Sequence, residues 1–379
     1  MPDHFRERLQ KGVILCDGAM GTLLFARGIP YEHCFDEANL SNPKLVQQIH
    51  QDYILAGAEI IETNTFGANP VKLAHHGLED KIRDINFRGA KIAREAREIV
   101  GKPVFVAGSI GPLGKPLEPI GKITKSEALG DFKQQAEGLL EGGVDLFMIE
   151  TMVNLEEMKQ AILAVKQICE LPIVAQMTFT EDGKTVMGNS PEQVVDELQT
   201  LQVDVIGANC SVGPLGIYEV VQRILARTQL RVSAQPNAGL PRLVDGRFIY
   251  LSSPEYFAEY AENFVSAGVS LVGGCCGTTP QHIKAMHDAL QNLRRSGAVQ
   301  VSTLEKIEVT PKTERVETAP PLQVELSDFA RKLQQKKFVV SVELDPPKGV
   351  NPEKILEGAR AIKKAGADAC NIGDSPMPG

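Results

Sequence analysis

Short apolar runs alternate with longer amphipathic stretches over the first 295 residues of the chain. A typical run follows a small turn that contains glycine and ends at polar residues, as in Gly142-Gly-Val-Asp-Leu-Phe-Met-Ile-Glu-Thr151. A continuous apolar run between helical stretches is typical of a strand in a parallel sheet that helices cover on both faces. The pattern therefore predicts an α/β protein in which parallel strands alternate with helices.

The number of apolar runs indicates which α/β fold forms. Helices are predicted to start near Pro43, Asn154, Ser190-Pro191 and Thr279-Pro280, because these residue types favour helix N-termini. A (β/α)8 TIM barrel needs eight such strand–helix units, whereas a doubly wound open sheet usually has fewer and carries a phosphate loop. No clear Gly-x-Gly-x-x-Gly follows a strand here, so we predict the barrel. The eight runs lie near 12–16, 58–62, 103–107, 145–149, 172–177, 203–208, 231–235 and 269–273.

The pattern changes after residue 295. Residues 296–330 begin with a stretch rich in Thr, Glu, Val and Pro without clear periodicity, which predicts an inter-domain linker after the barrel domain 1–295. Residues 331–379 contain one strand, one helical stretch and a second glycine-preceded apolar phrase. We interpret them as the truncated start of a second βα barrel, which is either poorly ordered or docked on the first domain.

Composition narrows the classes of partner. With 43% hydrophobic residues, the 379-residue chain can bury a large core. A formal net charge of −8 and the lack of a basic run argue against nucleic acid and anionic membrane surfaces. No secretory h-region follows Met1, and no apolar stretch approaches the roughly 18–20 residues that a membrane helix needs. We therefore expect a soluble cytoplasmic protein.

Three of the seven cysteines fall at predicted strand ends. Cys210 follows the sixth run, and Cys275 and Cys276 follow the eighth, within Gly273-Gly-Cys-Cys-Gly277. Chemistry in such barrels lies at the carboxyl ends of the strands, so the three sulfurs can converge there and suit Zn²⁺ with one position left open. A redox or vicinal-disulfide role is the alternative. The remaining thiols are interpreted as small core residues: Cys16, Cys34, Cys169 and Cys370.

A zinc ion held by three thiolates is better suited to binding another thiol than to splitting water. A free thiol is mostly protonated at neutral pH, and coordination removes its proton while the sulfur stays nucleophilic. The ion also fixes the position of the sulfur for in-line attack on a methyl group.

Carboxylates at other strand ends complete the predicted site. Asp17, followed by Gly18, comes after the first run, and Glu150 ends the fourth. Two carboxylates can bind a substrate ammonium through charge-assisted hydrogen bonds, and backbone N–H groups of a glycine-rich segment can bind a substrate carboxylate. Asp17 and Glu150 can instead be an acid–base pair of a hydrolase, or each can cap the following helix. Asn209 and Asn237 are candidates for orienting the substrate, and Asn237 can lend an oxygen to zinc when substrate is absent.

Together these motifs resemble the homocysteine S-methyltransferase family. They follow one another across residues 10–295: Asp17-Gly-Ala-Met-Gly-Thr22, Glu62-Thr-Asn-Thr-Phe-Gly67, Gly108-Ser-Ile-Gly-Pro112, Glu150-Thr151, Gly207-Ala-Asn-Cys210, Pro236-Asn-Ala-Gly239 and Gly273-Gly-Cys-Cys-Gly-Thr-Thr-Pro280. The resemblance implies zinc on Cys210, Cys275 and Cys276, and Asp17 and Glu150 on the homocysteine amino group. The expected enzyme transfers a methyl group to L-homocysteine, with the zinc-bound thiolate as nucleophile, and forms L-methionine.

The tail resembles the start of methylenetetrahydrofolate reductase, as found in bifunctional proteins. The matching segments are Ser341-Val-Glu-Leu-Asp-Pro-Pro-Lys348 and Asn371-Ile-Gly-Asp-Ser-Pro376, and the resemblance implies a proton-transfer role near a flavin for Glu343. FAD is expected only in a full-length bifunctional form, because reductase activity would need a missing C-terminal part. This neighbour favours methyltetrahydrofolate as methyl donor and leaves methylcobalamin, S-adenosylmethionine and S-methylmethionine open.

Two other functions stay open from the residues alone. A zinc hydrolase would use Glu150 as base, and a non-catalytic module would use the cysteines for structural zinc or redox sensing. The expected partners are homocysteine and a small-molecule methyl donor, and the sequence allows a homo-oligomer.

Overall fold

The computed structural model describes residues 2–239, 242–244, 247–295, 329, 331–332, 335, 337–344 and 353–372. The chain divides into two compact units, Met1–Thr303 and Leu304–Gly379. The first unit contains the residues predicted for the metal and substrate site, whereas Glu343 lies in the second unit. The predicted linker 296–330 lies, apart from residue 329, outside the described residues.

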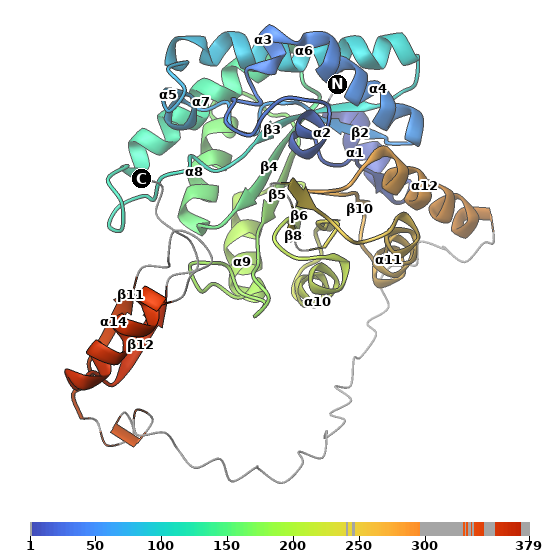
Figure 1. Cartoon of the computed structure of the whole chain (residues 1–379). Helices are drawn as coiled ribbons and strands as arrows, with labels where there is room; N and C mark the ends of the chain where they lie inside the picture. The colour runs from blue at the N-terminus through green and yellow to red at the C-terminus, as the bar shows by residue number, and fades with distance from the viewer. Residues whose placement is uncertain are drawn as a thin grey trace. The chain divides into compact units, whose positions relative to one another are not determined.

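The first unit is built around a ring of parallel strands (Figure 1). Eight strands form one sheet in the order β1-β10-β7-β6-β5-β4-β3-β2, and a parallel bridge between Cys16 and Ile60 joins its two edges. The predicted (β/α)8 barrel is therefore confirmed. The strands are β1 (Ile14–Leu15), β2 (Ile60–Glu62), β3 (Phe105–Ile110), β4 (Leu146–Met152), β5 (Ile173–Met177), β6 (Val205–Asn209), β7 (Arg231–Gln235) and β10 (Leu271–Val272).

Helices surround the ring, and the predicted starts are found (Figure 1). Asn154 caps one helix by accepting from Glu156 N at 2.8 Å, and Ser190 forms a capping box with Gln193. The helices are α1 (Pro2–Gln10), α2 (Gly21–Ala26), α3 (Ala38–Ser41), α4 (Pro43–Ala56), α5 (Pro70–Ala74), α6 (Ile82–Val100), α7 (Lys125–Gly142), α8 (Leu155–Lys166), α9 (Pro191–Leu198), α10 (Pro214–Leu225), α11 (Pro254–Ala267) and α12 (Pro280–Arg295). A small antiparallel pair, β8 (Arg242–Val244) and β9 (Arg247–Ile249), was not predicted.

Helix α1 closes the N-terminal end of the barrel. Phe5 and Leu9 on this helix are buried against the side chains that fill the barrel interior. The Phe5 ring also meets the Phe105 ring edge-on, with 5.4 Å between centroids. The interior side chains in this cluster are Ile14, Cys16, Ile60, Ala107, Leu146, Met148, Val174, Val205 and Leu271.

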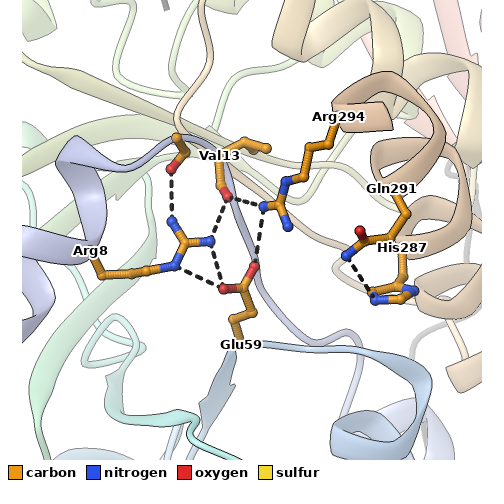
Figure 2. Close-up of polar contacts among 7 residues, drawn as sticks. Arg8, Val13, Glu59, His287, Gln291 and Arg294 are labelled. Carbon is orange, nitrogen blue, oxygen red and sulfur yellow. Dashed lines mark hydrogen bonds and ion pairs between the residues drawn. The ribbon is translucent and has the colours of Figure 1, made fainter. Parts of the chain in front are cut away.

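Polar contacts hold α1 and α12 to the starts of the first two strands (Figure 2). Arg8 donates to Glu59 Oε2 at 2.6 Å and to the carbonyl of Val13 at 2.9 Å. Arg294 of α12 donates to the same Val13 carbonyl at 2.8 Å and lies 3.5 Å from Glu59 Oε1. These contacts fix the N-terminal face of the barrel, so the C-terminal face is the one left for chemistry.

The buried histidine of α4 gives the fold a pH dependence. His50 is fully buried, and neither ring nitrogen has a hydrogen-bond partner among the described residues. Burial lowers the pKa of His50 from 6.5 to about 3, because the interior disfavours the charged ring. The unfolded chain binds the proton more readily, so stability is complete above pH 6.5 and is lost as pH falls toward 3.

We therefore expect His50→Leu to flatten the acid side of the stability curve. Between pH 7 and pH 5 the wild-type protein should lose about 2 kcal/mol more of its free energy of unfolding than the variant. Urea titrations with a chelator at both pH values measure this difference without interference from bound metal. Equal losses in the two proteins would mean that the ring is protonated or partnered in the folded state.

The second unit contains a parallel strand–helix–strand segment among its described residues. Strand β11 (Ser341–Leu344) pairs in parallel with β12 (Ala369–Ile372), and α14 (Glu353–Lys364) connects them. This is the order of elements predicted for the tail. Across the described part of the chain, no helix combines the length and apolarity needed to cross a membrane.

Candidate metal and substrate site

Three cysteine sulfurs meet at the C-terminal end of the barrel. The Sγ atoms of Cys210, Cys275 and Cys276 all lie within 4.8 Å of one another, and those of Cys210 and Cys276 are 3.9 Å apart. All three side chains are partly exposed. Three soft donors at this spacing form a group that could hold a metal ion, with access from solvent for a further ligand. Their role as ligands stays a prediction.

The backbone turns sharply to present these sulfurs. Cys210 and Ser211 have φ angles of 61° and 62°, in the left-handed region that residues with a side chain rarely adopt. Such conformations persist where the surroundings impose them, and they concentrate at functional sites. Here Cys210 N donates to the Gln235 carbonyl at 3.1 Å, and Cys275 N donates to the Pro236 carbonyl at 2.8 Å. Both cysteine segments are thus anchored to the end of β7.

Glycine is required beside the cysteine pair. A Cβ on Gly273 would lie 2.7 Å from Cys16 Cβ, and a Cβ on Gly277 would lie 2.1 Å from the Tyr250 ring. Gly277 also has a φ of 79°. The glycines therefore let β10 pack against the end of β1 and let Tyr250 cover the segment that follows Cys276.

The pKa values of the three thiols are shifted in different directions. Hydrogen bonds from Cys275 and Cys276 lower the pKa of the Cys210 thiol, whereas the same contacts and burial raise the pKa of Cys275. A thiolate at Cys210 that receives two S–H groups is an electron-rich centre. A bound cation would take the place of those protons.

Three acidic side chains lie beside the sulfurs, and all come from strand ends. The backbone N–H of Glu62 donates to Asp17 Oδ2 at 3.0 Å, while Asp17 Oδ1 is buried without a partner among the described residues. The side chains of Glu62 and Glu150 lie near enough for each to shift the pKa of the other. Burial raises the pKa of all three carboxyls, and the charge of Glu150 raises those of Asp17 and Glu62 further. A bound cation would therefore stabilise the ionised forms of these carboxyls.

Glu150 points into this cluster because β4 is irregular at that residue. The pairing register between β4 and β5 shifts between Ile149 and Met152, and Thr151 has a φ of 59°. Such bulges re-aim side chains beside active sites. Asn209 supports the bulge, since its Oδ1 accepts from Thr151 N at 2.8 Å and its Nδ2 donates to Glu150 Oε2 at 3.2 Å.

Asn209 also connects the acidic cluster to the sulfurs, because its Nδ2 lies 3.9 Å from Cys275 Sγ. Asn237 lies near enough to Cys210 to lower the pKa of its thiol, and the buried Oδ1 of Asn237 has no partner within the described part of the chain. Gly18 lies where a Cβ would meet Thr278 Oγ1 at 2.5 Å, so its glycine is required for packing. The structure therefore brings Asp17, Glu150, Asn209 and Asn237 to one end of the barrel.

Two interpretations of single residues are corrected. The carboxylates do not act as helix caps, because Asp17 accepts from the backbone of β2 and helix α8 is capped by Asn154. Among the cysteines interpreted as core residues, Cys16 is buried, whereas Cys370 is exposed on the second unit.

Sequence reasoning missed several polar partners of the site. Glu62, Ser109 and Gln235 each end or lie in a strand, and all contact the acidic cluster. Glu62 lies within Glu62-Thr-Asn-Thr-Phe-Gly67, so its place at a strand end was the available signal. Its side chain was not assigned a role because sequence alone does not show that β2 and β4 direct their side chains toward each other.

Most of the chain matches one known protein family. The family profile described as homocysteine S-methyltransferase matches residues 14–290. Methionine synthases from Mycobacterium tuberculosis and Mycobacterium leprae are each 35% identical, over 304 and 301 residues, or 76% and 75% of this chain. The chain spans about a quarter (25%) of the length of these curated relatives.

A solved structure matches the barrel as well. The metallated form of the homocysteine methyltransferase MmuM from Escherichia coli superposes with a TM-score of 0.65 at 26% sequence identity. The match covers 75% of this chain and 99% of that protein.

Proposed function

Because the chain belongs to the homocysteine S-methyltransferase family, we propose that it transfers a methyl group to the thiol of L-homocysteine in a zinc-dependent reaction and forms L-methionine. The observation that carries the proposal is the meeting of three partly exposed sulfurs within 4.8 Å at the C-terminal end of the barrel. Family membership favours this reaction over a zinc hydrolase or a structural zinc module.

The donor set fits zinc. Cys210, Cys275 and Cys276 supply three soft sulfur donors, and the unpartnered Oδ1 of Asn237 beside Cys210 suits a fourth ligand when substrate is absent. When bound, zinc would keep the homocysteine sulfur deprotonated and fixed in place at neutral pH. The similar Escherichia coli protein has been solved in a metallated form, which supports a bound metal in this chain as well.

The acidic cluster fits the substrate ammonium. The unpartnered Asp17 Oδ1 is a buried acceptor that a charged N–H group would satisfy, and Glu150 supplies a second carboxylate. An ammonium would also offset the like charges that now raise the pKa of Asp17. We assign the substrate carboxylate to the backbone around Gly18. With its amino-acid end held by these groups, homocysteine can extend its sulfur toward the three cysteines.

The methyl donor approaches from the open side of the cysteines. Tyr250 covers Gly277. Burial and the negative charge of Cys276 raise the pKa of both Tyr31 and Tyr250, so both phenol groups lie near that sulfur. Their rings give a donor an apolar surface beside the reacting sulfur. We favour methyltetrahydrofolate, with S-adenosylmethionine and S-methylmethionine as the other candidates. The argument for folate rests on the second unit, proposed as the start of a methylenetetrahydrofolate-reductase-like barrel.

The test is methionine formation by the zinc-loaded full chain with each donor supplied separately, measured by mass spectrometry. We expect methionine from homocysteine and methyltetrahydrofolate. Methionine from a sulfonium donor alone would overturn the donor assignment and retain the reaction. No methionine from any donor, with zinc bound, would contradict the proposed function.

A further inference from the structure

Three buried residues with hydroxyl groups connect the end of β2 to β3 beside Glu150. Thr63 and Thr65 follow β2, and Ser109 lies on β3. Thr63 Oγ1 and Thr65 Oγ1 are 2.6 Å apart, and Thr65 Oγ1 donates to the Ser109 carbonyl at 2.8 Å. Ser109 N in turn donates to Thr63 Oγ1 at 3.0 Å. The three contacts form a closed ring of hydrogen bonds between the two strand ends.

The direction of each hydrogen bond in this ring follows from the groups involved. A carbonyl oxygen only accepts, so Thr65 uses its one hydroxyl proton on the Ser109 carbonyl. Thr63 therefore donates its proton to Thr65 Oγ1, and its oxygen accepts from Ser109 N. Gln135 of α7 donates to the Thr65 carbonyl at 2.7 Å and ties the ring to a helix. The ring uses only the backbone of Ser109 and leaves its hydroxyl group free.

The hydroxyl group of Ser109 donates to Glu150. Ser109 Oγ lies 2.7 Å from Glu150 Oε1 and has no other hydrogen-bond partner among the described residues. The second oxygen of the carboxyl, Oε2, accepts from Asn209 Nδ2 at 3.2 Å and from Thr151 Oγ1 at 3.4 Å. The Ser109 contact is the shortest of the three. Each oxygen of Glu150 is thus held by a different donor.

Glu150 depends on side-chain contacts because the regular pairing of β4 stops just before it. Strands β3 and β4 pair through Ser109 with Met148 and through Ile110 with Ile149, and the register between β4 and β5 shifts after Ile149. The donor therefore lies on a regular strand, whereas the acceptor lies on an irregular one. A side chain that is already held in place loses less conformational entropy when a ligand binds to it.

We propose that Ser109 is a positioning residue that holds Glu150 toward the ammonium of the substrate, so that the protein distinguishes an α-amino thiol from a thiol without an amino group; this inference rests on the proposed function. A site built to bind an N–H group disfavours an analogue that lacks it, because buried acceptors are then left unpaired. The property that Ser109 controls is therefore the preference between two thiols.

The test compares L-homocysteine with 4-mercaptobutanoate, which has the same thiol and carboxylate but no amino group. Calorimetry on the zinc-loaded full chain measures the affinity for each thiol in the wild-type protein and in Ser109→Ala. We expect the variant to bind L-homocysteine about tenfold more weakly and 4-mercaptobutanoate as tightly as the wild-type protein does. KM for homocysteine should rise by a similar factor, while kcat changes little.

Ser233→Ala is the matched control. Ser233 is also buried on a strand of the barrel, and its Oγ lies 3.0 Å from Gln176 Nε2. This variant should leave both affinities unchanged. Zinc content and the thermal midpoint report folding. If Ser109→Ala does not fold, Ser109→Cys, a weaker donor of similar size, should show the same contrast between the thiols with a smaller loss.

Two results would overturn the inference. An equal loss of affinity for both thiols would show that Ser109 shapes the site as a whole, and unchanged affinities would show that Glu150 does not depend on it. Neither result affects methyl transfer by the wild-type protein, which tests the proposed function separately. If the zinc-loaded wild-type protein binds neither thiol, both proposals fail.

Discussion

Replacing Cys276 with alanine is expected to abolish zinc retention and methyl transfer together. The change removes one of three sulfurs that lie within 4.8 Å of one another and leaves two thiols, which is too few to hold zinc against a chelator. The loss of affinity should exceed the roughly 10–100-fold effect of removing a residue that only supports a ligand. Metal per chain after dialysis and methionine formation measure the two effects on the same sample.

Cys169→Ala is the matched control for this experiment. Its thiol is also partly exposed, but it bonds to the Val165 carbonyl at 3.7 Å at the end of α8. This variant should keep both zinc and activity. Full activity in Cys276→Ala would contradict the assigned site, and a loss in both variants would point to general damage by cysteine removal.

Replacing Asp17 with asparagine is expected to raise KM for homocysteine by about 10–100-fold while zinc remains bound. The change removes a charged acceptor for the ammonium, and a hydrogen bond to a charged group contributes about 1.5–3 kcal/mol. Asparagine can still accept from the Glu62 backbone N–H, so the loop after β1 should keep its conformation. Steady-state kinetics at saturating donor, together with zinc analysis, separates substrate binding from metal binding.

Asp288→Asn provides the corresponding change on the surface of α12, where the aspartate pairs with Lys284. Its KM should equal that of the wild-type protein. An unchanged KM in Asp17→Asn would remove Asp17 from the substrate site. Loss of zinc in that variant would instead indicate a structural role near the cysteines.

The barrel could be predicted because buried parallel strands leave a strong pattern in the sequence. All eight apolar runs became strands, and their number favoured a closed ring over an open sheet. The β8–β9 pair was missed because each strand has three residues, too few for a period to show. Asp245-Gly246 between them is a hairpin signal that could have indicated it.

The site was predictable where residue type and strand end coincide, as they do for Cys210, Cys275 and Cys276. The proximity of Glu62 to Glu150 was not, because it depends on side-chain direction across the barrel mouth. A shift of register beside Thr151 sets the direction of the Glu150 side chain. Thr151 has a left-handed backbone conformation, and because the residue is not glycine, the sequence gives no sign of it. Local strain of this kind is imposed by tertiary contacts, here those of Asn209, and is therefore absent from sequence patterns.

The sulfur count around zinc tests the central claim most directly. X-ray absorption at the zinc edge should show three sulfurs near ~2.3 Å and one lighter ligand in the resting protein. After L-homocysteine is added, four sulfurs should appear, with release of about one proton per site. Three sulfurs before and after addition, with homocysteine in excess, would show that the substrate thiol does not reach the metal.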